Sequence, residues 1–179
     1  MKDLKKVDRR KAMKYANINR YIDDLIAIND SKEFEMSFLQ IYPSELTLNR
    51  ENDSDTHATF LDMDIKIENN QLITKMYDKR ESYDFEIVRL PFKNSNMPSK
   101  MFYNTIGAEI LRICRVTTNY KDFVSTSKPL LKRMRKQGAN DIHIKQVLIK
   151  SMTRHQESFN KYVVPMTDVI KDVMLVEDL

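Results

Sequence analysis

The sequence predicts an α+β fold, in which antiparallel β-hairpins and a helix are followed by a bundle of three helices. Between Leu61 and Glu68, apolar and charged residues alternate with the period of a strand that buries one face. After Pro98, apolar residues recur every three or four positions, as on the buried side of a helix. The chain of 179 residues holds 2 glycines, which argues against a glycine-rich phosphate loop and against a turn-rich sandwich.

Two hairpins and a helix are expected in the first half of the chain. The string RYIDDLIAI (20–28) predicts two short strands around a tight turn, because Tyr, Ile and Leu flank turn-tolerant Asp. A helix is expected over 31–42, with Ser31 as its N-cap and Pro43 after its end. Asn69-Asn70 predicts a two-residue turn after the alternating strand, because Asn tolerates positive φ.

Three helices are expected in the second half, at residues 99–116, 120–137 and 140–162. Pro129 lies inside the second of these and is expected to kink or split it, because proline removes a backbone donor. Gly138 follows the same helix and suits a C-terminal cap.

Charge is distributed unevenly along the chain, although the net charge is only +4. Residues 1–14 carry seven Lys/Arg against two acids, and residues 121–162 carry ten against three, whereas the segment between them is acidic. This pattern suits a protein that contacts a polyanion through its basic parts and holds cations in the middle, although uneven surface solvation explains it as well. The single cysteine, Cys114, excludes an internal disulfide and favours a reducing compartment.

Asp23 and Asp24 form the most specific chemical feature of the sequence. Adjacent carboxylates repel each other, so their place at the tip of a hairpin calls for an explanation beyond stability. A rigid pair of carboxylates suits Mg²⁺, and two such ions drive in-line phosphoryl transfer in polymerases. The alternative is an acidic turn without chemical function. Asp62 and Asp64 lie two apart on one strand face and are an alternative source of a metal ligand, although the solvent face of an amphipathic strand is the favoured interpretation. The three histidines have no metal-ligand spacing.

Several strings, taken in order, resemble the C-terminal half of a retroelement reverse transcriptase of the Penelope-like or a related animal type. These strings are RYIDDLIAI, FLDMDIKIENNQLITKMYDKR, FKNSNMPSKMFYNTIGAEILRICR and LLKRMRKQGAN, and the likeness extends from about Arg20 to about Tyr162. The resemblance implies a basic N-terminal segment (1–17), a partial palm (18–92), a helical thumb-like domain (93–162) and a C-terminal tail (163–179).

The resemblance also implies roles for individual residues. Asp23 and Asp24 would be catalytic and would bind Mg²⁺ or Mn²⁺, weakly in this chain alone. Tyr21 would support the template–primer. The remaining implied nucleic-acid contacts are Met76, Tyr77, Asp78 and Lys79 at the primer end, and Lys128, Lys132, Arg133, Arg135 and Lys136 along the duplex.

The sequence departs from the family pattern upstream of the YIDD string. A reverse transcriptase palm needs a further catalytic Asp from an upstream strand, and the acids before Asp23 are Asp3 and Asp8, neither in a strand-like run. We therefore expect a polymerase fragment that is inactive alone and that binds an RNA/DNA template–primer duplex. A non-catalytic nucleic-acid-binding module and an assembly module are the alternatives. The missing half of the polymerase or another copy of the chain is the expected protein partner, in the nucleus or cytoplasm, with no membrane association.

Overall fold

The computed structural model describes residue 13 and residues 15–28, 33–52, 54–85 and 87–175, and it has the expected α+β composition. The chain divides into two compact units, Met1–Leu61 and Asp62–Leu179, which are described separately below. No helix in the described ranges combines the length and the apolar character needed to cross a membrane.

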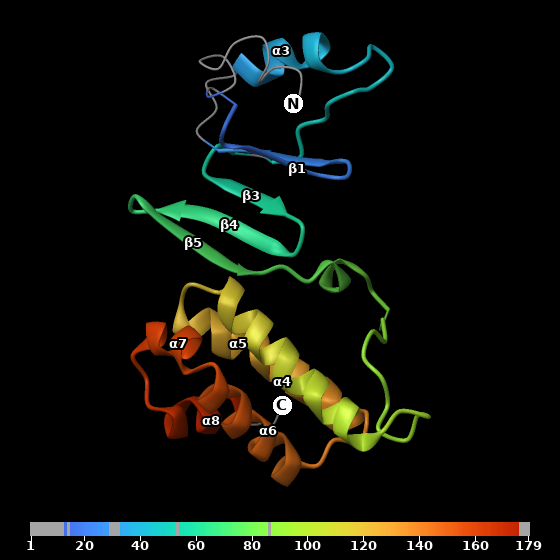
Figure 1. The fold of residues 1–179 in the computed structure, drawn as a ribbon, viewed down its shortest axis with the longest axis vertical. Coiled ribbons are helices and arrows are strands. Elements are labelled where there is room, and N and C mark those ends of the chain that lie inside the picture. Colours follow the sequence, from blue (N-terminus) through green and yellow to red (C-terminus); the bar gives the residue numbers. More distant parts are fainter. Residues whose placement is uncertain (1–12, 14, 29–32, 53, 86, 176–179) are drawn as a thin grey trace. The chain divides into compact units, whose positions relative to one another are not determined.

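The first unit contains the predicted acidic hairpin. Strand β1 (Ile18–Tyr21) pairs with antiparallel β2 (Asp24–Ala27), and helix α3 (Glu33–Ile41) and strand β3 (His57–Phe60) follow along the chain (Figure 1). A small core of Tyr15, Ile18, Phe34 and Phe38 joins the hairpin to α3. The expected N-cap, Ser31, lies outside the described residues. The first unit therefore holds its hairpin against one helix through a few aromatic side chains.

The second unit begins with the predicted alternating hairpin. Strands β4 (Met63–Glu68) and β5 (Gln71–Met76) pair in register from Glu68↔Gln71 to Met63↔Met76. The turn residues Asn69 and Asn70 have φ values of 50° and 60°, which is the left-handed pair that a tight type I′ turn requires. The predicted two-residue turn is therefore confirmed.

The expected alternation of buried and solvent-facing residues over 61–68 is wrong on both faces, because Leu61 and Ile67 of the apolar set are 42% and 46% exposed, whereas Asp64 is buried. Asp64 is 7% exposed, although the alternation placed it in water together with Asp62. Asp64 lies opposite Lys75 in the pairing register, and its Oδ2 is 3.4 Å from the Lys75 ammonium. The cross-strand cation compensates part of the cost of burying the carboxylate, which period-two alternation alone does not reveal.

The hairpin is attached to the helices through the backbone of Thr74. Its carbonyl accepts a hydrogen bond from the Thr118 amide at 2.7 Å, and its amide donates to Thr118 Oγ1 at 3.0 Å. The Thr74 hydroxyl also donates to the carbonyl of Val116. The loop between the first two long helices thus takes up backbone groups of β5 that β4 does not satisfy.

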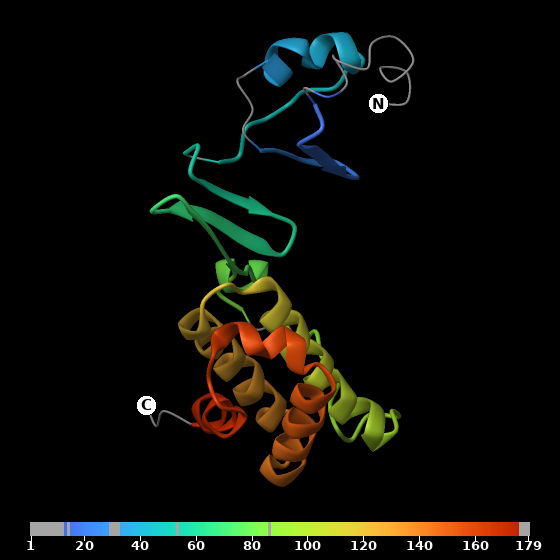
Figure 2. The ribbon, with the colours of Figure 1, turned by 60° about the vertical axis from the view of Figure 1, so that its left-hand side comes forward.

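The helices of the second unit form one bundle (Figures 1 and 2). After the short 3₁₀ helix η1 (Lys79–Ser82), the elements in chain order are α4 (Ser99–Val116), α5 (Tyr120–Lys136), α6 (Asp141–Arg154), α7 (Gln156–Phe159), the 3₁₀ turn η2 (Asn160–Tyr162) and α8 (Met166–Met174). The first predicted helix is confirmed residue for residue. The third is interrupted after Arg154, and α8 packs against α5 and α6 to complete the bundle.

The bundle core follows the predicted helical stripes. Its fully or almost fully buried members include Phe102, Ile106, Ile110, Cys114, Phe123, Leu131, Met134, Ile144, Leu148, Val169 and Val173. Burial of a large apolar side chain stabilises a fold by about 1.5–3 kcal/mol. The shared core therefore makes α4, α5, α6 and α8 depend on one another.

Helix α5 continues through Pro129, so the predicted split does not occur. Pro129 lies on the exposed side of α5, as does Ser125 four residues earlier. The Ser125 carbonyl loses its helical donor at the proline, but on the solvent side water can replace that donor. The position of the proline on the helix, more than its presence, decides the outcome.

Gly138 ends α5 in the predicted way. Its φ is 99°, and its amide donates to the Arg135 carbonyl at 3.0 Å, while the Ala139 amide donates to the Met134 carbonyl at 2.9 Å. This pair of bonds is a Schellman motif, which satisfies the last carbonyls of a helix and favours glycine at the left-handed position.

We expect Gly138→Ala to lower the free energy of unfolding by about 1 kcal/mol or more, because alanine is strained at positive φ. The added Cβ would also lie 3.2 Å from Cβ of Lys93. Urea unfolding followed by circular dichroism measures the change. Gly138→Asn is the matched control and should lose less, since Asn tolerates left-handed backbone. A gain in stability with alanine would contradict the assignment.

Candidate metal-binding hairpin and nucleic-acid interface

Asp23 and Asp24 lie at the tip of the β1–β2 hairpin, but in different positions. The turn residues are Ile22 and Asp23, and Asp24 is already the first residue of β2, paired with Tyr21. Both carboxylates and the Tyr21 ring are exposed to solvent. The sequence prediction of two neighbouring, accessible carboxylates on a hairpin is therefore realised, with the turn one residue earlier than the Asp-Asp pair.

The backbone of Ile22 is strained. Its φ is 55° and its side chain is 72% exposed, so a β-branched residue adopts the left-handed region without burying its side chain in return. Such a conformation costs about 1–3 kcal/mol and persists only where neighbouring structure imposes it. Strain of this kind concentrates at functional sites, which makes the turn a candidate site on geometry as well as on sequence.

Arg20 connects the strained turn to the core of the first unit. Its Nε donates to the Ile22 carbonyl at 2.6 Å, and its guanidinium lies 5.3 Å from the ring centroid of Tyr42. Tyr42 in turn stacks on the buried Phe38 ring at 4.7 Å. One arginine thus couples the position of the acidic tip to the aromatic core.

The pair fits a hard cation only in part. Carboxylate oxygens are the ligands that Mg²⁺ prefers, and the exposed tip leaves room for the waters that this ion retains. Within the described ranges, no group of three His, Cys, Asp or Glu side chains lies close enough to hold a metal. Asp62 and Asp64 are engaged elsewhere, with Arg112 and Lys75 respectively. Among the residues that the structure describes, the hairpin therefore offers two neighbouring carboxylates, Asp23 and Asp24.

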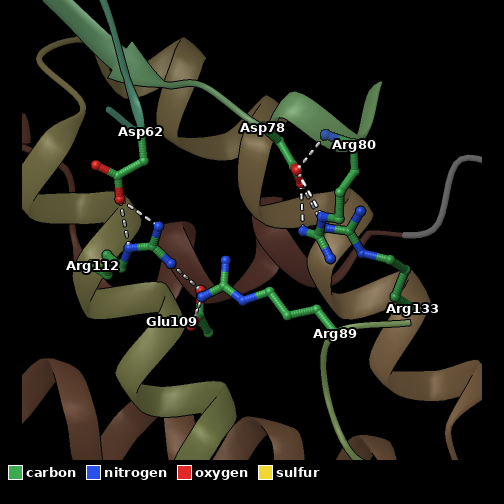
Figure 3. Close-up of polar contacts among 7 residues, drawn as sticks. All are labelled: Asp62, Asp78, Arg80, Arg89, Glu109, Arg112 and Arg133. Carbon is green, nitrogen blue, oxygen red and sulfur yellow. Dashed lines mark hydrogen bonds and ion pairs between the residues drawn. The ribbon is translucent and has the colours of Figure 1, made fainter. Parts of the chain in front are cut away.

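Asp78, at the expected primer end, lies at the base of the β4–β5 hairpin (Figure 3). It caps η1 by accepting from the Arg80 amide at 3.2 Å, and Arg80 Nε donates to it at 2.7 Å. The Arg133 guanidinium on α5 lies 3.6 Å from its Oδ2. The hydrogen bonds from Arg80 lower the pKa of the Asp78 carboxyl, against the opposing effect of burial, and the charge of Arg133 contributes to the lowering.

The other residues expected at the primer end differ in exposure. Lys79 is exposed, whereas Met76 packs against the bundle core and Tyr77 is half-buried. The Tyr77 amide donates to the Asp62 carbonyl at 2.9 Å, which brings Asp62 to the same end of the hairpin as Asp78. In the segment that the sequence assigns to the primer end, Met76, Tyr77 and Asp78 are thus partly buried and Lys79 is exposed.

A second ionic network, centred on Arg112 of α4, lies at the same hairpin base (Figure 3). Arg112 Nε donates to Asp62 Oδ2 at 3.1 Å, and Nη1 donates to Glu109 Oε2 at 3.1 Å. Glu109 accepts a further bond from Arg89 Nη2 at 3.0 Å through its other oxygen. The Glu109–Arg112 spacing of three residues is a helical signal visible in sequence, whereas nothing in the sequence pointed to Arg89, twenty residues away.

The basic residues predicted along α5 fall into two groups. Lys128, Lys132 and Lys136 follow one another at four-residue spacing, and Lys121 extends the same face seven residues earlier. Lys121, Lys132 and Lys136 are exposed, and Lys128 is half-buried. These four residues form the lysine stripe.

The two arginines of the predicted set make contacts within the second unit. Arg133 pairs with Asp78, and Arg135 Nε donates to Asp141 at 2.7 Å. Arg135 Nη2 also donates to the Met174 carbonyl at the end of α8 at 3.1 Å. Arg133 and Arg135 therefore connect elements of the second unit, and the duplex contact predicted for all five residues stays a prediction.

Comparison of the chain with protein-family profiles, with curated proteins and with solved structures finds no match. The likeness to reverse transcriptases remains a prediction from the order of the sequence strings. Functional conclusions accordingly rest on the acidic hairpin and on the lysine stripe themselves.

We expect Ile22→Asn to raise the free energy of unfolding of the first unit by about 1 kcal/mol, because Asn relieves left-handed strain that costs an ordinary residue roughly 1–2 kcal/mol. Thermal or urea unfolding measures the change. Ile28→Asn is the matched control: Ile28 is also largely exposed, at 51%, but lies outside the positive-φ positions. Equal effects of the two substitutions would show that strain at Ile22 is not the cause.

We expect Asp78→Asn to lower stability at neutral pH by about 1 kcal/mol, because hydrogen bonds to a charged group are worth more than neutral ones. Asn still serves as an N-cap, so the change isolates the charge. Because the folded-state pKa of Asp78 lies below 3.8, the stabilisation is complete above that pH and is lost as the pH falls through the lowered pKa. Unfolding curves between pH 7 and pH 2 should therefore converge at the acid end.

Asp84→Asn provides the control for the acid series, since Asp84 is an exposed carboxylate in the same segment. It should follow the wild-type pH dependence. A constant offset between wild type and Asp78→Asn down to pH 2 would contradict the charge-based role of Asp78.

Proposed function

We propose that the chain supplies the catalytic hairpin of the palm and the thumb of a retroelement-type RNA-directed DNA polymerase, and that by itself it binds a template–primer duplex without extending it. The observation that carries the proposal is the pair Asp23 and Asp24, adjacent, exposed and placed at a strained turn. The order of the sequence strings and the separate lysine stripe support the same reading.

In this proposal Asp23 and Asp24 hold divalent metal at the hairpin tip. Bound Mg²⁺ would lower the pKa of the attacking hydroxyl and stabilise the charge that develops during phosphoryl transfer. Arg20 acts as a positioning residue, because its bond to the Ile22 carbonyl fixes the turn that carries both carboxylates. The third carboxylate comes from a segment or a partner chain beyond the described residues.

The lysine stripe contacts the phosphate backbone of the duplex. From Lys121 to Lys136 the helix rises about 22 Å, enough to follow several phosphates of one strand. Asp122 is the one acidic residue of α5, so the helix carries little negative charge that would oppose the lysine stripe. Lysine ammonium groups bind phosphates as flexible point charges, which suits recognition without sequence preference.

A binding module without chemistry is the second candidate, and the lysine stripe is the observation that favours it. The stripe lies on α5, and binding of phosphate by its ammonium groups does not require the hairpin to have a catalytic role. Both candidates place the chain with nucleic acid, in the nucleus or cytoplasm. They differ in whether the acidic hairpin binds metal.

We expect the chain to bind a fluorescent RNA–DNA template–primer with an affinity that falls steeply with salt. Changing both Lys132 and Lys136 to Glu should weaken binding at least tenfold, because it replaces attraction to phosphate by repulsion. The matched control is Lys145→Glu with Lys150→Glu, at two exposed positions of α6, which makes the same change in net charge. Fluorescence anisotropy at several salt concentrations measures both. Absence of duplex binding at low salt would overturn the proposal.

Metal binding by the acidic hairpin is tested in a separate experiment. Asp23→Asn with Asp24→Asn should leave duplex affinity unchanged without added metal, but should abolish the weak Mn²⁺ binding that electron paramagnetic resonance detects. Asp55→Asn, which neutralises a carboxylate elsewhere in the first unit, should leave Mn²⁺ binding unchanged. Unaltered Mn²⁺ binding in the double variant favours the module without chemistry. Templated extension by the chain alone, with dNTPs and Mg²⁺, would refute its predicted inactivity.

A further inference from the structure

Arg89 differs from the other arginines at the base of the β4–β5 hairpin. Its side chain is 47% exposed, and one hydrogen bond, from Nη2 to Glu109 Oε1, fixes its guanidinium. Arginine carries five N–H donors in a planar fork, so this bond leaves most of the donors of Arg89 available to a ligand. Glu109 itself is only 20% exposed and is held from the other side by Arg112. The result is an arginine held in place with part of its donor fork in solvent.

Stability does not account for this arrangement. A half-exposed ion pair contributes little, with measured values of about 0–1 kcal/mol. Arg112 already satisfies the second oxygen of Glu109, so Arg89 is not required to prevent an unpaired carboxylate. Preorganisation of an exposed guanidinium is, by contrast, what recognition of a phosphate or carboxylate needs.

The location of Arg89 favours a phosphate. Glu109 and Arg112 connect it to Asp62, whose carbonyl accepts from the Tyr77 amide beside Asp78 and Lys79. Figure 3 shows the seven side chains of this region, four arginines and three carboxylates, gathered where β5 continues into η1. Lys79 adds an exposed cation and Asp84 an exposed carboxylate in the same segment. The feature that favours an anionic ligand at this surface is therefore the exposed part of the Arg89 guanidinium, near the segment that the proposed function assigns to the primer end.

We propose that Arg89, oriented by Glu109, binds one backbone phosphate of the primer strand close to its 3′ end. The inference rests on the proposed function, because it needs a duplex held with its primer end at Met76–Lys79. It adds a contact from the segment between η1 and α4, separate from the lysine stripe on α5. Because the 3′ end fixes the register, Arg89 meets the same phosphate in every complex.

A double-mutant cycle between protein and nucleic acid tests the contact. Wild type and Arg89→Gln are titrated with template–primers in which single primer phosphates near the 3′ end are replaced, one at a time, by uncharged methylphosphonate. In wild type, one position should weaken binding about fivefold to tenfold, the size of a charge-assisted contact. Arg89→Gln should bind the unmodified primer more weakly by a similar factor. Methylphosphonate at that position should then cause no further loss of affinity in this variant. The slope of log affinity against log salt concentration should be smaller in this variant by roughly 0.9, which corresponds to the loss of one phosphate contact.

Two further variants separate the contact from a change in structure. Arg115→Gln removes an exposed positive charge from the last turn of α4 and should keep the full methylphosphonate effect. Arg89→Lys keeps the charge but not the fork, and should give an intermediate coupling. Circular dichroism melting of each variant checks that the bundle is intact.

Each outcome has a defined meaning. Equal methylphosphonate losses in wild type and Arg89→Gln at every position would overturn the Arg89 contact. If the lysine-stripe variant weakens binding while Arg89→Gln does not, the contact is wrong and the proposed function stands. If wild type binds no template–primer, both fail.

Discussion

The second unit depends on the way in which the helices satisfy the outer edge of β5. The edge of β5 that faces away from β4 is an outer edge of the sheet, and such an edge presents backbone N–H and C=O groups without strand partners. At Thr74, the Thr118 amide donates to the backbone carbonyl of β5 and the Thr118 hydroxyl accepts from its amide. The Thr74 hydroxyl also donates to the Val116 carbonyl. The hairpin base is consequently fixed against α4 and α5, and both ionic networks at that base form because their partners are held within reach.

The sequence predicted the elements whose causes are local. Asn69-Asn70, the apolar stripe of α4 and Gly138 each act through their own backbone or through neighbours a few residues away, and all three are as expected. Asp64 was misjudged, and Pro129 does not split α5, because both outcomes depend on which side of an element faces solvent. Arg89 was missed because its partner lies twenty residues away on α4, and no spacing rule connects a loop residue to a helix surface.

In the candidate site, too, features with local causes were predicted and the other features were not. Tyr21, Asp23 and Asp24 were correctly expected to share a hairpin, since strand and turn chemistry decide that locally. The strain at Ile22 could not be predicted, because it depends on a backbone φ angle that the sequence does not reveal. On α5 the charge pattern identified a basic helix but not the roles within it. Arg133 and Arg135, with their directional forks, form ion pairs with Asp78 and Asp141, whereas Lys132 and Lys136 are exposed.

The lysine stripe has a consequence for movement as well as for affinity. Ammonium groups on long flexible stems hold phosphates without a fixed bonding geometry, and Lys128, Lys132 and Lys136 repeat at equal intervals along the helix. A duplex lying on such a face meets nearly the same attraction after it shifts by one nucleotide, so the energy surface for sliding is shallow. On the proposed function, translocation after each addition would need little work at the thumb, and the resistance to slippage would come from contacts nearer the primer end.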